Sequence, residues 1–407
     1  NITDHYKRLD SNPTAIFKSE YDLLLKGWRD KELIDEDEFR YLSTDHPIVP
    51  TIYFLPKVHK HATNPPGRPI VSSIGSLLEN TSRFLDIFLH EYVTTLPSYL
   101  RDTTDFLKRI NGIPWRTNYL MATIDAVSLY TSINHTQGIR AAKHFLRTRP
   151  INLLEHTNML VEMLDYCLVH NVFTFENSFY WQLQGTAMGT AFAPTYANLL
   201  MGWWEESQVW TDDNQDNLER VILWVRYIDD LFILWDGNHE DLEKFIINLN
   251  NNDLNLKFTY SISDDSLNFL DVEVFIHENL MNTRIHRKDT SCNSILHAGS
   301  CHPKHLKWSI PYGEMLRARR NCSNDQEFSK EVMNMKLRFL QRGYPEQVLD
   351  EASKRASAKN RDYLLISKKN RSAKSNEDSH TIRYITNFDN QHKEVRSLLN
   401  KTWGILK

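Results

Sequence analysis

The sequence has no long apolar run and few cysteines. No apolar stretch in its 407 residues approaches the roughly 20 residues of a membrane-spanning helix, so we expect no membrane partner. The first ten residues, NITDHYKRLD, are polar and do not resemble a secretory signal. The four cysteines show no disulfide-framework spacing, which favours a reducing compartment.

Charged residues of both signs are common, but they are unevenly distributed along the chain. The net charge of −4 by itself argues against a nucleic-acid partner. Residues 284–374, however, hold 20 Lys and Arg against 9 Asp and Glu, whereas residues 1–283 hold 23 against 39. A basic C-terminal module therefore follows an acidic body, and a local basic face can bind phosphate whatever the overall charge. A solvated helical surface would give the same charge run.

Residues 221–235, VILWVRYIDDLFILW, form the central pattern of the chain. Two apolar runs, each short enough to be a strand, flank Asp229 and Asp230. Adjacent carboxylates in so apolar a stretch are costly if they are buried unpaired, and a divalent cation such as Mg²⁺ relieves that cost. The stretch predicts a hairpin with a metal site at its turn. A polar turn between two core strands would give the same pattern.

Residues 119–133, YLMATIDAVSLYTSI, predict a strand that runs into a turn and a short helix. Asp125 lies at the end of the apolar run. If Asp229 reaches it, the two could form a two-metal site, in which ions about 4 Å apart hold the attacking and leaving oxygens of an in-line displacement. Taken alone, Asp125 would more often be a helix N-cap.

Two further segments carry candidate nucleotide contacts. Residues 51–74 predict a β-hairpin with Lys57, Lys60 and Arg68 at one end, where they could close over a triphosphate or remain solvated loop charges. Residues 184–202, QGTAMGTAFAPTYANLLMG, predict a small-residue loop that leads into a helix. Such a loop allows close approach of a flat ring, such as a base pair, or of packed backbone.

The other segments predict packing elements, and none suggests chemistry. Apolar spacing predicts helices within 1–45, 75–115, 136–170 and 240–252, hairpins at 172–183 and 267–286, and a strand at 254–263. Residues 354–380 are polar and charged and are typical of a flexible linker.

The basic module supports two interpretations. Five residues between 289 and 322 are potential zinc ligands, but their spacing fits no familiar zinc pattern: Cys292, His297, Cys301, His302 and His305. The favoured interpretation is a basic helical module, in which Arg317, Arg319, Arg320 and Arg338 are interleaved with aromatic residues. That combination suits a groove that follows a nucleic-acid backbone.

The order of these motifs resembles that of a reverse transcriptase. Over about residues 46–345, the blocks LPKVHK, RPIVSS, DAVSLYTSI, QGTAMGTAFAPTYANLLMG, RYIDDLFILW and LNFLDVEV resemble those of Penelope-like retroelements, relatives of telomerase. The resemblance implies an α+β right-hand polymerase with fingers, a palm with an antiparallel sheet and a mostly helical thumb. The implied regions are an N-terminal helical extension (1–45), fingers (46–120), palm (121–283), thumb (284–353) and a linker with the start of a C-terminal region (354–407).

The same resemblance implies roles for individual residues. Asp125 and Asp229, with Asp230 in support and the Ala126 carbonyl contributing, would bind two Mg²⁺ or Mn²⁺ ions. Tyr130 would act as the steric gate against a ribose 2′-OH.

The remaining implied contacts surround the incoming nucleotide. Gln184 and Gly185 would lie against the nucleotide, and Arg68 with Lys57 or Lys60 would contact its triphosphate.

The function that the resemblance implies is RNA-directed DNA synthesis by a retrotransposon enzyme in the nucleus. Its partners would be an RNA template, a DNA primer or nicked target DNA, and dNTP. No GIY-YIG endonuclease motif is present, so the chain is either truncated or lacks that domain. An RNA-directed RNA polymerase is disfavoured by the bulk of Tyr130, and an inactive RNA-binding scaffold by the retained aspartates.

Overall fold

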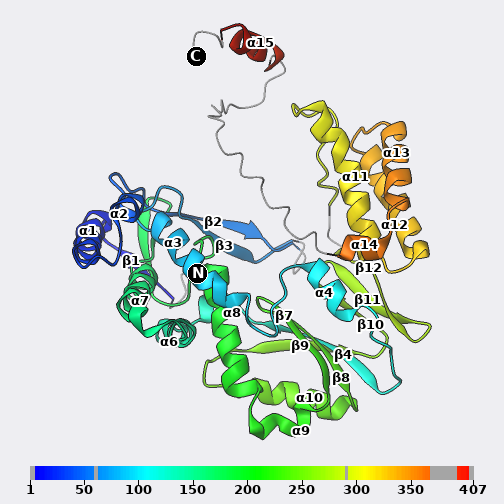
Figure 1. The fold of residues 1–407 in the computed structure, drawn as a ribbon, viewed down its shortest axis with the longest axis horizontal. Helices are drawn as coiled ribbons and strands as arrows, with labels where there is room; N and C mark the ends of the chain where they lie inside the picture. Colours follow the sequence, from blue (N-terminus) through cyan, green and yellow to red (C-terminus); the bar gives the residue numbers. More distant parts are fainter. Residues whose placement is uncertain (1–4, 59–62, 289–291, 367–391, 403–407) are drawn as a thin grey trace. The chain divides into compact units, whose positions relative to one another are not determined.

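The chain has mixed α and β structure. A computed structural model (Figure 1) describes residues 5–58, 63–288, 292–366 and 392–402. They fall into two compact units: residues 1–102 with 116–269 form the first unit, and residues 103–115 with 270–407 form the second. Within the described ranges, no helix combines the length and the apolar character needed to cross a membrane.

Five strands form one sheet of the first unit. In spatial order they are β1 (Tyr6–Leu9), β6 (Ser178–Gln182), β5 (Val172–Phe175), β2 (Thr51–Pro56) and β3 (Gly67–Ser72). The hairpin predicted in 51–74 is confirmed by the antiparallel pairing of β2 with β3. The hairpin predicted at 172–183 is also confirmed, because β5 and β6 pair about a two-residue turn at Glu176 and Asn177, both with positive φ.

Four strands form the other sheet of the first unit. In spatial order they are β7 (Val221–Tyr227), β8 (Asp230–Asp236), β4 (Tyr119–Ala126) and β9 (Phe258–Ser263), and all pairings are antiparallel. Residues 231–235 of the inner strand β8 are fully buried, which explains why its apolar residues do not alternate with polar ones. The predicted aspartate hairpin is confirmed, with only Ile228 and Asp229 between its strands.

Helices pack with the four-stranded sheet around one large core, whereas Ile52, Val71 and Phe173 of the five-stranded sheet belong to a separate, smaller cluster (Figure 1). The helices are α1 (Thr14–Asp30), α2 (Glu36–Leu42), α3 (Glu79–Val93), α5 (Leu129–Ser132), α6 (His135–Leu146), α7 (Leu154–Val169), α8 (Ala193–Trp204), α9 (Gln215–Leu218) and α10 (His239–Leu249). A π-helical turn, Glu205–Val209, follows α8 directly. The short strand β10 (Ser266–Phe269) ends the unit, and its Phe269 ring lies 5.5 Å from that of Phe232.

The helical pattern at 136–170 is interrupted. The structure has two helices here, since α6 ends at Leu146 and α7 begins at Leu154 after a short 3₁₀ turn. Pro150 lies between them, and proline both lacks a backbone N–H and disfavours the helical conformation of the preceding residue. The helical structure predicted within 136–170 is therefore confirmed as two helices on either side of this break.

The second unit contains a hairpin and a helical cluster. The hairpin pairs β11 (Val272–His277) with β12 (Leu280–Ile285). Met315, Phe328, Phe339 and Leu349 are buried in one core that joins three of the helices. The helices are α4 (Thr103–Ile110), α11 (Lys304–Asn321), α12 (Asp325–Leu340), α13 (Glu346–Ser357), α14 (Arg361–Leu365) and α15 (His392–Thr402).

The linker predicted at 354–380 is in part helical. Residues up to 357 belong to α13, and α14 follows, with Ala356 and Leu365 buried. The prediction was wrong for these residues because the buried apolar side chains of Ala356 and Leu365 anchor an otherwise charged segment. Residues 367–380 lie outside the described part of the chain.

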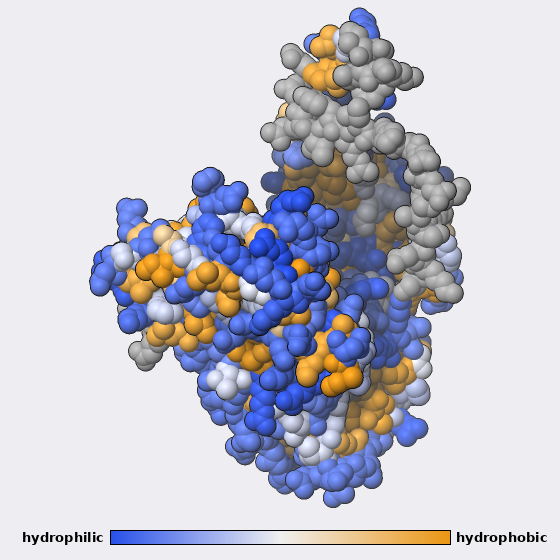
Figure 2. Space-filling view, turned by 60° about the vertical axis from the view of Figure 1, so that its left-hand side comes forward, coloured by the Kyte–Doolittle hydropathy of each residue, from blue (hydrophilic) through white to orange (hydrophobic). Residues whose placement is uncertain are grey.

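Side chains on the surface are mixed in character. On the face in Figure 2, apolar patches are interspersed with hydrophilic residues. Tyr53, Phe54 and Leu55 of β2 are about half exposed. Exposed apolar residues on a strand of the β2–β3 hairpin show that this hairpin is not a core element along its whole length.

Candidate active site

Three aspartates lie at the same end of strands β4 and β8 of the four-stranded sheet. Strand β4 pairs with β8 so that Asp125 lies directly opposite Asp230. Asp229 occupies the turn before β8, and its carbonyl accepts a hydrogen bond from the Ala126 N–H (3.4 Å). Asp125 is exposed, whereas Asp229 and Asp230 are half-buried. The structure therefore brings together the residues that the sequence selected from two distant segments.

The environment of Asp229 disfavours its charged form. Burial raises the pKa of this carboxyl above its ordinary value, and the negative charge of Asp125 raises it further. Its own backbone N–H and the cations of Arg68 and Arg226 act in the opposite direction but do not cancel the shift. An additional cation at this edge would relieve the repulsion between the two carboxylates.

The turn that presents Asp229 has an unusual backbone. Ile228 has φ +58°, and a β-branched residue in the left-handed region costs on the order of 1–3 kcal/mol. The surrounding structure must therefore hold this conformation. One contact that does so is a hydrogen bond of 3.0 Å from an Arg226 Nη to the Ile228 carbonyl.

Tyr130 lies in the short helix α5, within electrostatic reach of the carboxylates. Burial raises the pKa of Tyr130 to about 12, and the charge of Asp229 contributes. The positive charge of Arg68 acts in the opposite direction. Tyr130 is therefore a neutral phenol at physiological pH, half-buried beside Asp229 and Arg68.

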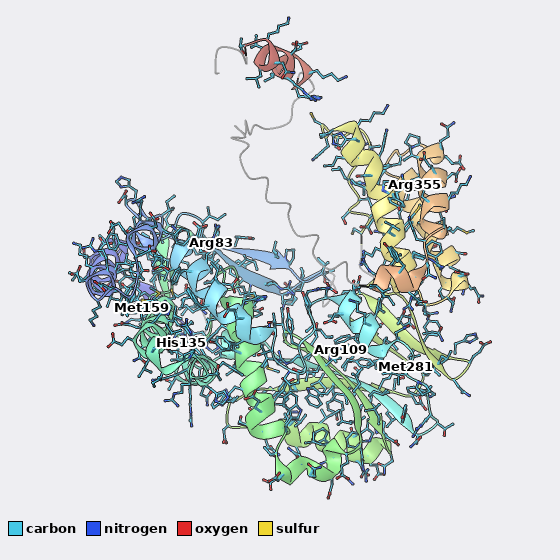
Figure 3. All side chains as sticks on the ribbon, in the orientation of Figure 1. Arg83, Arg109, His135, Met159, Met281 and Arg355 are labelled. Atoms are coloured by element: carbon cyan, nitrogen blue, oxygen red, sulfur yellow. The ribbon has the colours of Figure 1, made fainter. Side chains whose placement is uncertain are left out.

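The loop after β6 is hydrogen-bonded to the turn that carries Tyr130. Thr186 N–H donates to the Tyr130 carbonyl (2.7 Å) and Gly185 N–H to the Ile133 carbonyl (2.9 Å). Gly185 has φ +76°, and a Cβ there would lie 2.4 Å from the Tyr130 carbonyl oxygen. His135, labelled in Figure 3, adds a contact of 2.7 Å between its Nε2 and the Gly185 carbonyl. Only glycine fits this approach of the loop to the Tyr130 turn.

The same loop also holds the strand that carries Arg68. Val71 N–H of β3 donates to the Met188 carbonyl (2.8 Å). Gly189 has φ +127°, and a Cβ there would lie 2.2 Å from the Val71 carbonyl oxygen. Residues 184–190 therefore fix both Tyr130 and β3 relative to each other.

The predicted nucleotide contacts have different positions. Arg68 is exposed on β3, and its charge lowers the pKa values of both Asp229 and Tyr130, so it lies near the carboxylates. The Gln184 amide donates to the Ser132 carbonyl (3.0 Å), which is a structural contact. Lys57 follows β2, and its backbone N–H donates to the Pro66 carbonyl. Lys60 lies outside the described residues.

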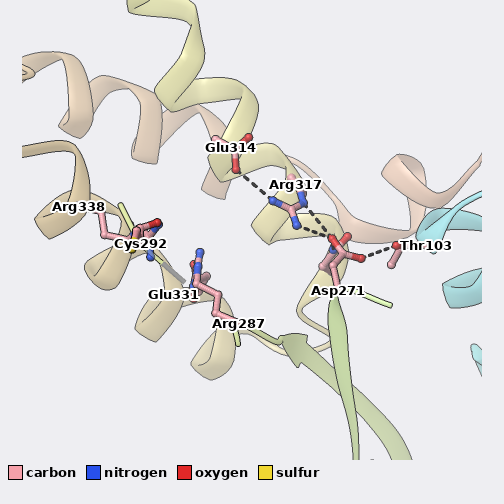
Figure 4. A network of polar contacts seen from close by, with 9 residues as sticks. Thr103, Asp271, Arg287, Cys292, Glu314, Arg317, Glu331 and Arg338 are labelled. Atoms are coloured by element: carbon pink, nitrogen blue, oxygen red, sulfur yellow. Dashed lines mark hydrogen bonds and ion pairs between the residues drawn. The ribbon is translucent and has the colours of Figure 1, made fainter. Parts of the chain in front are cut away.

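The predicted nucleic-acid contacts lie in the second unit and take part in internal contacts (Figure 4). Arg317 Nε donates to Asp271 (3.0 Å), and its Nη1 pairs with Glu314 (3.3 Å). Burial alone would raise the pKa of Asp271, but hydrogen bonds from Thr103 and Arg317 hold it below its ordinary value. Arg338 donates to the Cys292 carbonyl (3.2 Å).

Of the two remaining arginines, Arg319 also makes internal contacts. Arg319 donates to the Lys359 carbonyl (2.9 Å) and lies over the Phe328 ring. Arg320 is half-buried. Nucleic-acid binding by these four arginines stays a prediction.

A metal ion at the aspartate edge would need ligands in addition to the protein side chains. Within the described ranges, no group of three or more His, Cys, Asp or Glu side chains is arranged to hold a metal ion. This result gives no support to a zinc site at Cys292 and its neighbours. At the aspartate edge, Asp125 and Asp229 could supply two carboxylates, and Mg²⁺ commonly completes such a set with waters and substrate phosphates.

Sequence patterns did not identify Arg226, which is fully buried and within electrostatic reach of Asp229. They also missed Glu205, the fully buried carboxylate that pairs with Arg226. One signal was present, because Arg226 is the single charged residue in the apolar strand 221–227. Its partner lies 21 residues earlier in another element, so spacing alone could not identify it.

Comparisons with known proteins give partial matches. The family described as the animal helix-turn-helix domain matches residues 294–354, which include α11 and α12. No curated protein sequence matches the chain.

Solved structures with some similarity are polymerases. Telomerase from Candida albicans, in complex with a TWJ fragment of telomeric RNA, is 12% identical with a TM-score of 0.49, over 79% of this chain and 58% of that chain. Apo telomerase from Candida tropicalis is 12% identical with a TM-score of 0.47, over 84% and 62%. A BmCPV RNA-dependent RNA polymerase at quiescent state is 12% identical with a TM-score of 0.46, over 76% and 29%.

The chain thus spans about 60% of the telomerase chains and less than a third of the viral polymerase. Similarity at this level assigns neither an activity nor a binding partner to the chain.

The close approach of Gly185 predicts a large effect of a single methyl group. Gly185→Ala should destabilise the protein by about 1–3 kcal/mol, because alanine is strained at positive φ and its Cβ would collide with the Tyr130 carbonyl. Urea unfolding measures the change. The control is Gly27→Ala in α1, where a Cβ would meet no atom within 4 Å. This substitution should stabilise the protein by up to about 1 kcal/mol, because alanine favours a helix more than glycine does. An unchanged midpoint for Gly185→Ala would contradict the packing.

The raised pKa of Asp229 predicts a pH-dependent stability. The pKa of Asp229 in the folded state exceeds its unfolded value of about 3.9. At a pH above the folded-state pKa, the ionised carboxylate therefore lowers the free energy of unfolding. At a pH below the unfolded-state pKa, the carboxyl is protonated in both states and has no such effect. In EDTA, Asp229→Asn should therefore melt at a higher temperature than the wild type at pH 8, with no difference near pH 3.5. The exposed Asp264→Asn is the control. A lower melting temperature for Asp229→Asn at pH 8 would refute the assignment.

Proposed function

We propose that the chain is an RNA-directed DNA polymerase that extends a DNA 3′-OH on an RNA template. The observation that carries the proposal is the strand register that places Asp125 opposite Asp230 and within electrostatic reach of Asp229. Tyr130 and Arg68 lie within electrostatic reach of that edge. The motif resemblance to Penelope-like retroelements supports assignment to a retrotransposon enzyme that acts in the nucleus, with fingers, palm and thumb.

The proposed site would hold two Mg²⁺ or Mn²⁺ ions on Asp125, Asp229 and the Ala126 carbonyl, with Asp230 in support. The carboxylates fit such a group, because burial and the charge of Asp125 raise the pKa of Asp229 and a cation would stabilise its ionised form. When bound, the ions would promote ionisation of the primer 3′-OH and neutralise the charge of the triphosphate.

The protein's own residues would bind and orient the substrate, because positioning and charge stabilisation dominate phosphoryl transfer. Arg68, with Lys57 or Lys60, would neutralise the dNTP triphosphate. Tyr130 would occupy the space of a ribose 2′-OH.

The remaining assignments extend from that centre. The loop at Gln184 and Gly185 would support the nascent base pair, and arginines of the second unit, among them Arg317 and Arg338, would contact the backbone of template RNA and primer. A nicked target DNA would supply the primer in the cell.

Substitution of one carboxylate tests the proposal. Asp229→Asn should reduce primer extension on RNA with dNTPs and Mg²⁺ by at least about 100-fold, because it removes an anionic ligand, while RNA binding by fluorescence anisotropy stays unchanged. Asp264→Asn is the matched control on an exposed turn. Extension by Asp229→Asn at the wild-type rate would reject the site. A wild type that binds RNA but extends no primer would favour the scaffold alternative.

Sugar selection distinguishes a DNA polymerase from an RNA polymerase. Tyr130→Ala should lower the preference for dNTP over NTP by about 10- to 100-fold, since the phenol would no longer fill the 2′-OH space. The kcat/KM ratio for the two substrates measures it, with the exposed Tyr41→Ala as control. A wild type that prefers NTP would identify an RNA-directed RNA polymerase, and unchanged selection by Tyr130→Ala would remove its role.

A further inference from the structure

A buried ion pair lies directly behind the aspartate turn. Arg226 of β7 and Glu205 of the π-helical turn have fully buried side chains. Arg226 Nε donates to one Glu205 oxygen (3.0 Å) and an Nη to the other (3.1 Å). This bidentate geometry fixes the plane of the guanidinium.

Glu205 is fully satisfied by its surroundings. Besides Arg226, it accepts hydrogen bonds from Ser98 Oγ (2.6 Å) and Trp224 Nε1 (2.8 Å). Both donors come from other segments of the first unit. Glu205 therefore serves as a fixed anchor for Arg226 rather than as a mobile charge.

The second Nη of Arg226 reaches the turn itself. It donates to Asn198 Oδ1 (2.9 Å) and to the Ile228 carbonyl (3.0 Å). Ile228 is the residue with φ +58° that precedes Asp229. The backbone of Arg226 is also fixed, because its N–H donates to the Ser98 carbonyl (2.7 Å) and its carbonyl accepts from Leu100 N–H (2.8 Å).

Stability alone does not account for this arrangement. Replacing a buried ion pair by apolar residues is often neutral or stabilising, whereas such pairs can specify one conformation. The conformation that this pair would specify is the left-handed backbone of Ile228. A β-branched residue adopts that conformation only when its surroundings impose it.

We propose that Arg226, anchored by Glu205 and Asn198, is a positioning residue that fixes the Ile228 turn and thereby the Asp229 carboxylate within electrostatic reach of Asp125. The proposal rests on the polymerase function proposed above. It assigns to Arg226 no contact with substrate, and it makes Glu205 and Asn198 part of the machinery that places the metal-binding edge.

Arg226→Lys tests the proposal. The ammonium keeps the charge opposite Glu205 but cannot donate to Glu205 and the Ile228 carbonyl in the same planar geometry. We expect a folded protein whose kcat for primer extension falls about 100-fold, as for a misplaced catalytic group, with KM for dNTP within about twofold. Binding of Mn²⁺ alone, measured by electron paramagnetic resonance, should weaken about tenfold.

Arg220→Lys is the matched control, because Arg220 immediately precedes β7 and pairs with Asp241 in a partly exposed ion pair. It should change neither kcat nor Mn²⁺ binding. A folded Arg226→Lys with wild-type kcat and Mn²⁺ affinity would overturn the proposal.

A second variant tests the proposal in case Arg226→Lys does not fold. Arg226→Met with Glu205→Gln removes both charges but leaves an amide oxygen that can accept from Trp224 Nε1 and an amide N–H that can donate to Ser98 Oγ, and it should show the same losses. If both variants unfold, the network is structural and the positioning role is rejected.

The Mn²⁺ measurement separates the two proposals. A wild type without extension, but with Mn²⁺ binding that Asp229→Asn abolishes, would reject the polymerase and still test Arg226 through Mn²⁺ affinity. A wild type that neither extends a primer nor binds Mn²⁺ would overturn both.

Discussion

The antiparallel ladder between β4 and β8 is the constraint on which the candidate site depends. It places Asp125 opposite Asp230, and a slip of one residue would turn every side chain of one strand to the other face. The register is fixed because Met121, Ala122 and residues 231–235 are all fully buried. Burial of the strand interiors thus determines which carboxylates face each other at the strand ends.

Close backbone contacts carry that constraint to the rest of the site. Two glycines, Gly185 and Gly189, let one loop approach the Tyr130 turn and strand β3 at distances that exclude a side chain. Arg68 and Tyr130 come from segments about 60 residues apart, yet the charge of Arg68 lowers the pKa values of both Asp229 and Tyr130. The positions of polar groups around Asp229 therefore follow from backbone packing more than from side-chain pairing.

Local patterns predicted the elements of the site, but not the contacts between distant ones. The aspartate hairpin was predictable because its apolar strands and polar turn are adjacent in sequence. The pairing of Arg226 with Glu205 was not, because it depends on how α8 and β7 pack. The same limit applies to Arg317, whose charge reads as a nucleic-acid contact in the sequence but pairs with Asp271 in the structure. At Pro150, by contrast, a local signal marks the point where the predicted helical region divides into α6 and α7.

The site combines several unfavourable features that a structure under selection for stability alone would lack. A β-branched residue adopts a left-handed conformation at Ile228, and Asp229 is kept where burial and Asp125 oppose its charge. Each costs free energy in the folded state, and the Arg226 network supplies hydrogen bonds that hold the first in place. Such costs persist where the strained geometry performs a task. Here the geometry directs two carboxylates from different segments toward one point, and a divalent cation bound at that point would turn their repulsion into attraction.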